Sequence, residues 1–230
     1  MLSKIRNLSA LYRSKGFAAT RNYVWERVAS AWNERHLGIE TTRIVEKAEM
    51  NIDNAEFAHY IPMTFGSLRR CLARVTIRPD EDVFIDYGCG KGRIVVVAAT
   101  MPFRRVLGVE ISPQLAKIAE RNVSSAARRL ACRDVRIIVH DATTYEVPDE
   151  LTFAFFFNPF TEGLFSQVLA RLRESLDRRP RRFTLIYGNA NDGVRQLLHA
   201  TPWLIPREEY FDWAMPATWS RMMILENKTN

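Results

Sequence analysis

The sequence predicts an α/β fold: a doubly wound, mostly parallel seven-stranded sheet with an N-terminal helical extension. Two observations predict it. Between about residues 77 and 225, short apolar runs rich in β-favouring residues alternate with segments of helical periodicity, as in parallel strands joined by crossover helices. The run at 151–157 is apolar throughout, as a central strand buried on both faces should be. We expect residues 1–58 to form the extension and a connector, and residues 59–230 the main domain.

A glycine-rich turn follows the apolar run 83–85 and precedes the helical segment 94–99. Gly88, Gly90 and Gly92 lack side chains, so the turn can be tight and a ligand can approach its backbone. A phosphate-binding P-loop requires Ser or Thr after the lysine, but Lys91 is followed by glycine. A dinucleotide fingerprint requires glycine or alanine where Arg93 stands, which weakens that alternative without removing it.

Polar residues stand at the ends of three further predicted strands. Glu110 follows the run 106–109, about 20 residues after the glycine loop, where a carboxylate can accept from both hydroxyls of a ribose. Asp141 follows the run 135–140, and Asn158 follows 151–157. Because the carboxyl ends of parallel strands meet at one edge of the sheet, we expect a shared ligand crevice there. On this pattern alone NAD would fit as well.

The remaining elements are predicted from periodicity and from turn and cap residues. Ser112 is a good N-cap, and Pro113 suits the first helical position, so a helix should run from there to about residue 130. The other predicted helices are 67–75, 164–176 and 194–199, the next strand is 183–188, and 209–211 with 222–225 form a closing antiparallel pair.

The segment Asp86-Tyr87-Gly88-Cys89-Gly90-Lys91-Gly92 resembles the first motif of class I S-adenosylmethionine-dependent methyltransferases, which have a Rossmann-like seven-stranded fold. The resemblance covers residues 77–225. It implies S-adenosylmethionine as cofactor, S-adenosylhomocysteine as product and no metal. It also implies cofactor-binding roles for the first-motif residues Asp86, Tyr87, Gly88, Cys89, Gly90 and Gly92, for Glu110 and Ile111 at the ribose, for Asp141 and Ala142 at the adenine, and for Asn158 and Thr64.

Asn158-Pro159-Phe160 resembles the N-P-P-Y or N-P-P-F motif of amino-group methyltransferases, in which the Asn side chain accepts from the target nitrogen. The chain has one proline where that motif has two, and Asn-Pro is also an ordinary turn signal. Tyr60 and Thr64 precede the first strand, where this class often covers the cofactor or shapes the acceptor pocket; packing of Tyr60 against the following helix is the alternative. The predicted catalytic residues are Asn158, Pro159, Phe160 and Tyr60.

More narrowly, four segments look like a family of bacterial class I methyltransferases whose substrates are mostly unassigned: Gly38-Ile39-Glu40-Thr41, Tyr60-Ile61-Pro62, the glycine loop and the N-P-F triplet. Protein-lysine methyltransferases with seven strands share the Y-x-P approach and a similar loop, but generally lack the triplet.

We therefore expect methyl transfer to nitrogen, with oxygen as the lesser alternative, on an unidentified small molecule or protein. Three other functions stay open: protein-lysine methylation, NAD-dependent oxidoreduction, and a catalytically silent cofactor-binding module. A hydroxyl acceptor would require a base, for which Glu56, His59 and His140 are the nearby residues.

The composition and charge of the chain limit which classes of binding partner and which location we expect. The formal net charge is +7, but the arginines are spread along the 230 residues, which favours a solvated surface over a nucleic-acid interface. Three cysteines without metal spacing indicate a reducing compartment, and the absence of a bilayer-length apolar run or a signal-peptide core makes the cytoplasm the expected location. Oligomeric state is not predicted.

Residues 1–36 are predicted to be helical and basic. Trp25, Val28, Ala29 and Trp32 share one helical face, and we expect this helix to lie on the main domain with its basic residues in water. The alternative is a peripheral element on an anionic membrane surface. That element would comprise Lys4, Arg6, Arg13, Lys15 and Arg21 with Leu8, Leu11, Tyr12 and Phe17.

Overall fold

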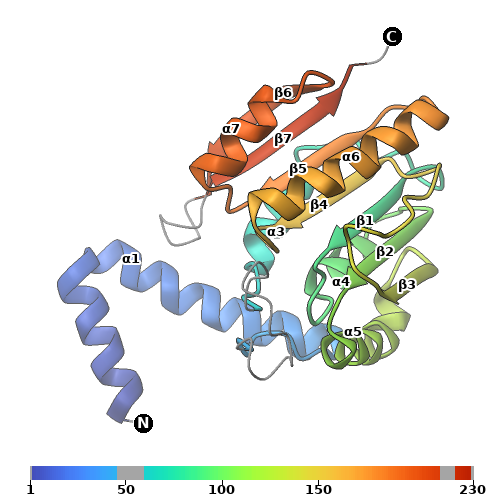
Figure 1. Cartoon of the computed structure of the whole chain (residues 1–230). Coiled ribbons are helices and arrows are strands. Elements are labelled where there is room, and N and C mark those ends of the chain that lie inside the picture. The colour runs from blue at the N-terminus through green and yellow to red at the C-terminus, as the bar shows by residue number, and fades with distance from the viewer. Residues whose placement is uncertain (1, 46–59, 213–220, 229–230) are drawn as a thin grey trace.

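A computed structural model describes residues 2–45, 60–212 and 221–228 (Figure 1). One seven-stranded sheet dominates it, with strand order β3-β2-β1-β4-β5-β7-β6. All neighbours are parallel except β7, which runs antiparallel to both β5 and β6. The strands are β1 Val83–Tyr87, β2 Arg105–Glu110, β3 Asp134–Val139, β4 Phe153–Phe157, β5 Thr184–Gly188, β6 Leu204–Phe211 and β7 Arg221–Asn227. The predicted fold class is confirmed.

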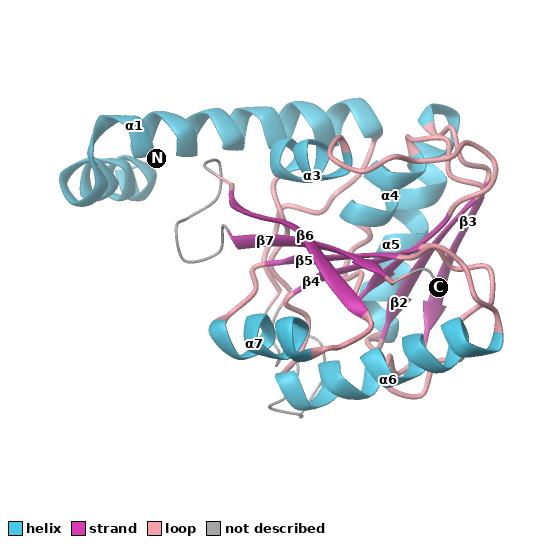
Figure 2. Ribbon diagram, turned by 90° about the horizontal axis from the view of Figure 1, so that it is seen from above, coloured by secondary structure: helices cyan, strands magenta, loops and turns pink. Residues whose placement is uncertain are grey.

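Helices cover both faces of this sheet, as a parallel sheet requires (Figure 2). On one face lie α1 Leu2–Leu37, α3 Phe65–Leu72, α4 Arg93–Ala99 and α5 Pro113–Ala126, the last continued by the 3₁₀ turn η1 Ala127–Arg129. On the other lie α6 Glu162–Arg178 and α7 Asp192–Ala200.

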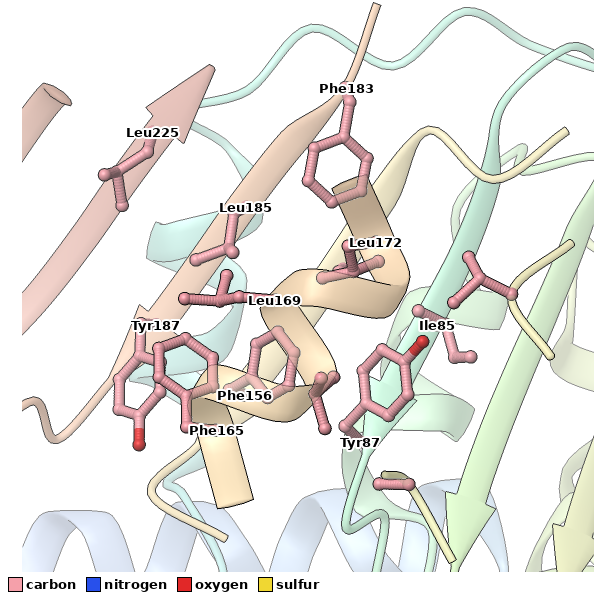
Figure 3. Packing of buried hydrophobic residues seen from close by; sticks show 14 of the residues in the cluster. Ile85, Tyr87, Phe156, Phe165, Leu169, Leu172, Phe183, Leu185, Tyr187 and Leu225 are labelled. Carbon is pink, nitrogen blue, oxygen red and sulfur yellow. The ribbon is translucent and has the colours of Figure 1, made fainter. Parts of the chain in front are cut away.

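The central strand β4 supplies aromatic side chains to both cores. Phe153 and Phe155 enter the core beneath α3 and α4, where the ring of Phe155 lies 6.1 Å from that of Phe84. Phe156 enters the core beneath α6, stacked 4.9 Å from Tyr87 and 5.8 Å from Tyr187 (Figure 3). Because side chains alternate along a strand, this apolar run fills both faces of the sheet at once.

Side-chain caps set where two helices begin. The hydroxyl oxygen of Ser112 accepts from the N–H of Leu115, which confirms the predicted start of α5. Helix α3 begins earlier than predicted, at Phe65, because the Thr64 hydroxyl accepts from the N–H of Ser67 and caps it there.

The helix α1 is present, but the expectation that its aromatic face would lie on the main domain is wrong. Trp25, Val28 and Trp32 are 65%, 58% and 61% exposed, whereas Ser30 and Asn33 are buried against the domain. No helix among the described residues is both long and apolar enough to cross a bilayer.

The connector expected between the N-terminal helix and residue 58 is described only to residue 45, and this part is packed against the domain. Ile39, Thr41 and Val45 are buried, and Val45 pairs with Tyr60 through an isolated antiparallel bridge. The predicted domain boundary at residues 58 and 59, like Glu56 and His59, lies outside the described residues.

Candidate functional site

The carboxyl ends of the parallel strands and the segment 60–63 enclose one cavity. The glycine loop after β1, the end of β2, the residues after β3 and the N-P-F triplet after β4 all contribute to its wall. The lining residues are Tyr60, Ile61, Pro62, Met63, Gly88, Cys89, Gly90, Arg93, Ile94, Val109, Glu110, Ile111, Leu115, His140, Ala142, Phe157, Asn158, Pro159 and Phe160. The topology thus places four separately predicted motifs around one space.

Two glycines of the loop are held where no side chain would fit. Gly88 has φ 73°, and a Cβ there would lie 2.6 Å from Cβ of Pro159. Gly90 has φ 54°, and a Cβ there would lie 2.2 Å from the ring of Tyr60. The loop therefore contacts both the N-P-F triplet and the predicted lid residue directly.

The carboxylate of Glu110 joins β2 to the glycine loop. Its Oε2 accepts from the N–H of Gly90 at 2.8 Å, and its Oε1 accepts from the N–H of Ser112 at 2.9 Å. Burial raises the pKa of Glu110, and these backbone donors oppose that rise. Each carboxylate oxygen can accept more than one hydrogen bond, so the arrangement leaves capacity for ribose hydroxyls.

Asp86 is the feature that best fits a cationic ligand. It is 1% exposed, and neither carboxylate oxygen has a hydrogen-bond partner among the described residues. Burial, and secondarily the charge of Glu110, raises the pKa of Asp86 well above its ordinary value. Its charge in turn acts on Tyr60 and Cys89, two residues of the cavity wall. A buried carboxylate without a partner is costly, so a protonated amine at this position would be strongly favoured.

Of the residues predicted to bind the adenine, only Ala142 lines the cavity. Ala142 and His140 line the cavity, but Asp141 does not. The Oδ1 of Asp141 instead accepts from the N–H and the hydroxyl of Thr143, both at 2.8 Å, in a local turn. Nδ1 of His140 lies 2.9 Å from the carbonyl oxygen of Asp141.

Asn158 adopts the left-handed backbone region, with φ 46°, which few residues other than glycine occupy. Its Oδ1 accepts from the hydroxyl of Tyr187 at 3.4 Å, and the residue faces the cavity. Pro159 and Phe160 follow it in the cavity wall. The strained turn thus directs all three residues of the triplet toward the shared space.

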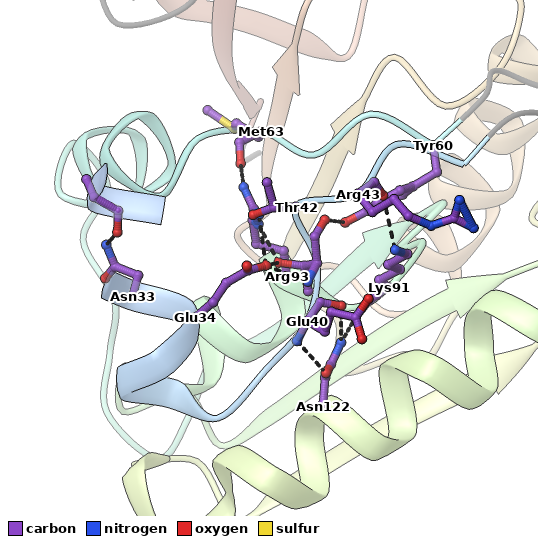
Figure 4. A network of polar contacts seen from close by, with 12 residues as sticks. Asn33, Glu34, Glu40, Thr42, Arg43, Tyr60, Met63, Lys91, Arg93 and Asn122 are labelled. Carbon is purple, nitrogen blue, oxygen red and sulfur yellow. Dashed lines mark hydrogen bonds and ion pairs between the residues drawn. The ribbon is translucent and has the colours of Figure 1, made fainter. Parts of the chain in front are cut away.

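A polar network joins the segments 39–45 and 60–63 to the start of α4 (Figure 4). The buried guanidinium of Arg93 donates to the hydroxyls of Thr41 and Thr42, at 2.7 and 2.8 Å, and to the carbonyl oxygen of Met63 at 2.8 Å. It also lies 3.4 Å from the carboxylate of Glu34.

Tyr60 is held by the same segment. Its hydroxyl donates to the carbonyl oxygen of Thr41 at 2.8 Å, and Lys91 Nζ lies 5.6 Å from its ring centroid while donating to the carbonyl oxygen of Arg43. Tyr60 is therefore positioned by the backbone of the segment 39–45 and by the Lys91 side chain of the glycine loop.

Several predicted site residues do not line the cavity, and Asp86, which lies just before the glycine loop, is one of them. Thr64 caps α3, and Tyr87 packs in the core beneath α6, because alternation along β1 turns it to that face. Gly92 caps α4 with φ 77° beside Ala119. Thr64 and Tyr87 therefore do not line the cavity, and a cofactor-binding role for either stays a prediction.

Sequence reasoning also missed part of the wall. The apolar lining residues Ile61, Met63, Ile94, Leu115 and Phe157 carry no chemical signal that separates them from core residues. Arg93, which in the sequence only marked a departure from the dinucleotide fingerprint, is a buried part of the same wall.

Comparison with known proteins agrees with this geometry. A family model described as a methyltransferase domain matches residues 84–186. A search of curated proteins finds no significant match.

Solved structures with the same fold include two named for RNA and one named for a porphyrin. An RNA methyltransferase from Salinibacter ruber, in complex with S-adenosyl-L-homocysteine, is 20% identical with a TM-score of 0.53, covering 74% of this chain and 95% of its own. Magnesium protoporphyrin IX methyltransferase from Synechocystis PCC 6803, with bound SAM, is 15% identical with a TM-score of 0.54, covering 71% and 77%. An rRNA methylase from Streptococcus thermophilus is 16% identical with a TM-score of 0.52, covering 73% and 98%. At these identities the likeness shows the fold and not the acceptor.

The strand order supports the same assignment. A classic dinucleotide-binding sheet has the order 3-2-1-4-5-6, whereas here the antiparallel β7 is inserted between β5 and β6. Together with the match of a methyltransferase-domain model to residues 84–186, this strand order shows that the chain has the Rossmann-like fold of class I methyltransferases.

Proposed function

We propose that the chain transfers the methyl group to a nitrogen nucleophile of a small molecule or protein, and that Asn158 orients this nitrogen. The supporting observation is the strained backbone of Asn158, which presents the triplet to the same cavity as the glycine loop. An ordinary Asn-Pro turn on the surface would explain neither this position nor the contact between Pro159 and Gly88.

In this proposal, protein groups hold the cofactor at three strand ends. Asp86 would pair with the amine of the cofactor's methionine part, Glu110 would accept from the ribose hydroxyls, and the backbone after β3 at Ala142 would meet the adenine. When bound, S-adenosylmethionine supplies an electrophilic methyl group. Methyl transfer is an in-line displacement, so the main task of the protein is to align the acceptor.

Asn158 has a suitable group for that alignment. Its side-chain oxygen can accept from an N–H of the acceptor, which fixes where the lone pair of the nitrogen points. The aromatic and apolar residues Tyr60, Pro62, Phe157 and Phe160 stand in the same cavity wall and would exclude water around it. A nitrogen acceptor needs no strong base once its amine is neutral.

A matched pair of substitutions tests the role of Asn158. Glycine tolerates the left-handed region, so Asn158→Gly removes the side chain without adding backbone strain. Asn189, which follows β5, has φ 60° but does not line the cavity, so Asn189→Gly is the control. We expect kcat/KM to fall roughly tenfold to a hundredfold in Asn158→Gly, the scale of one or two lost polar contacts, and to stay near wild type in Asn189→Gly. Equal effects in both variants would contradict the proposal.

The acceptor class can be found with labelled S-adenosylmethionine and fractionated cell extract. Treatment of the labelled product with mild alkali separates ester-type O-methyl groups, which are released as methanol, from N-methyl groups, which are stable. Label on oxygen would direct attention to His140, whose Nδ1 faces a backbone carbonyl and whose Nε2 could then serve as a base. Label in nucleic acid would overturn the proposed acceptor class.

A further inference from the structure

Helix α1 has an exposed apolar stripe, which we call the α1 stripe. It consists of Phe17, Val24, Trp25, Val28 and Trp32, exposed by 69%, 41%, 65%, 58% and 61%. Their spacing places all five on one side of the helix. A run of large apolar side chains this exposed, on a single helix face, indicates an interaction surface rather than scattered surface residues.

The opposite side of α1, which faces the main domain, is largely polar, although Leu37 at its C-terminal end joins the apolar core. Ser30 and Asn33 are buried there, and Asn33 Nδ2 donates to the carbonyl oxygen of Ala29. Glu34 accepts from the N–H and hydroxyl of Thr41 and lies 3.4 Å from Arg93. An amphipathic helix that served only to pack on this domain would show the reverse arrangement. The α1 stripe is therefore not explained by the fold of the described residues.

Charge indicates what could cover the α1 stripe. Helix α1 contains seven Lys or Arg residues and two acids, Glu26 and Glu34, giving a formal excess of 7 − 2 = +5 over the same residues. Both acids face the domain: Glu34 bonds to Thr41, and Glu26 is half-buried beside Thr64 and Arg70.

The exposed side keeps basic residues beside the aromatic ones. Arg21 lies four residues after Phe17 and four before Trp25, and it is exposed, as is Arg35. His36 stacks on Trp32 with ring centroids 5.1 Å apart. The described side chains of this face thus combine tryptophan with cations and include no carboxylate.

We propose that the α1 stripe docks on an anionic lipid surface, with Phe17, Trp25 and Trp32 at the level of the headgroups. Tryptophan is favoured at this depth, and flanking arginines gain from the negative potential of the surface. A second copy of the chain is disfavoured as the occupant, since pairing two stripes would bring two helices of the same +5 excess together. The helix would lie in the interface and not span it.

Sedimentation of the full chain with vesicles tests this. We expect binding to vesicles of phosphatidylcholine mixed with phosphatidylglycerol, little binding to phosphatidylcholine alone, and release as salt is raised. The fluorescence of Trp25 and Trp32 should shift to shorter wavelength only with the anionic vesicles.

Three variants connect binding to the α1 stripe. Trp25→Ser with Trp32→Ser should lower the partition coefficient at least about tenfold, and Arg21→Gln with Arg35→Gln by about tenfold or more. Phe211→Ser is the control, because Phe211 on β6 is 64% exposed but lies outside α1; its binding should equal wild type. Thermal unfolding confirms that each variant is folded.

Three results would overturn the proposal. The first is no sedimentation of the wild-type chain with anionic vesicles. The second is binding that the double tryptophan variant retains unchanged. The third is a dimer of the wild-type chain, seen by sedimentation velocity without vesicles, that the same variant dissociates, because the occupant would then be a second copy.

Discussion

Asp86 and Glu110 lie near the carboxyl ends of adjacent parallel strands, and both side chains are buried. They differ in their hydrogen bonds. Glu110 accepts from two backbone N–H groups, of Gly90 and Ser112. Asp86 has no partner for either carboxylate oxygen among the described residues. One carboxylate is therefore part of the fold, and the other is left for something that the fold does not supply.

The two carboxylates therefore serve different purposes: Glu110 holds the glycine loop in its conformation, whereas Asp86 is available to bind a ligand. Glu110 fixes the glycine loop whether or not a ligand is present, because its hydrogen bonds are internal. Asp86 contributes nothing to the free protein and weakens it, since a buried charge without a partner is unfavourable. Binding sites often keep such a group because the ligand then recovers the free energy that folding lost.

The largest expected effect is on Asp86→Asn. The amide cannot pair with an ammonium group as a carboxylate does, so affinity for S-adenosylhomocysteine should fall roughly 10- to 100-fold, measured by calorimetry. In the same variant the free energy of unfolding at neutral pH should rise by about 1–3 kcal/mol, because burial of a carboxyl group that is ionised in the unfolded chain no longer opposes folding.

Asp82 provides the matched control. It is also buried, but the N–H of Arg78 donates to it and the guanidinium groups of Arg78 and Arg182 pair with it. Asp82→Asn should destabilise the chain and leave affinity unchanged. If Asp86→Asn lowers stability in the same way, the side chain of Asp86 has a structural partner and its proposed role is wrong.

A stability change of opposite sign is expected for Glu110→Gln. The glutamine amide can accept from one backbone N–H but must turn its NH₂ toward the other, which leaves a buried donor unpaired. The free energy of unfolding should fall by about 1–3 kcal/mol, read from urea denaturation. Unchanged stability would show that Gly90 and Ser112 find other acceptors, and the contrast with Asp86 would be lost.

The pH dependence of stability should reflect the buried carboxylate of Asp86, which has no hydrogen-bond partner among the described residues. Burial, then the charge of Glu110, raises the folded-state pKa of Asp86 above its usual value of 3.8, so the folded chain keeps a proton that the unfolded chain has lost. The free energy of unfolding should therefore decrease as pH rises from that value to the folded pKa.

Cofactor affinity should change in the opposite direction over this window, by up to about tenfold per pH unit, because only the ionised carboxylate pairs with an ammonium. Calorimetric titrations of wild type and Asp86→Asn at matched pH give the difference that isolates Asp86 from Glu110. Parallel pH profiles for the two proteins would remove Asp86 from the site.

The positions of the strands, and of the motifs that follow them, could be predicted from the sequence because they depend on local residue patterns. The all-apolar run at β4 and the Ser112 cap each specify their structure within a few residues. The face of α1 was predicted wrongly because periodicity locates an apolar stripe but does not say what covers it. Trp25 and Trp32 give the same pattern whether they pack on a domain or lie exposed.

The site was predicted less completely, since its contacts join residues distant in sequence. Glu110 could be placed from its spacing to the glycine loop. Three other features arise only from tertiary packing. They are the unpaired carboxylate of Asp86, the contact of Tyr60 with Gly90, and the hydrogen bonds from Arg93 to the segment 39–45. A threonine two residues after Pro62 could equally be a ligand or a helix cap, and only the position of Ser67 decides it.

Thr64→Ala gives the smallest expected effect and marks the boundary of the site. The Thr64 hydroxyl accepts from the N–H of Ser67 and donates to its side chain at 2.8 Å, but Thr64 does not line the cavity. Loss of the cap should lower the free energy of unfolding by about 1 kcal/mol and leave affinity for S-adenosylhomocysteine at the wild-type value. Thr64→Ser, which keeps the capping oxygen, should restore the stability. If Thr64→Ala loses more cofactor affinity than its loss of stability explains, and Thr64→Ser restores that affinity, then Thr64 belongs to the cofactor site. Thr64 would then act in binding, as proposed for Asp86, as well as in the fold, as shown for Glu110.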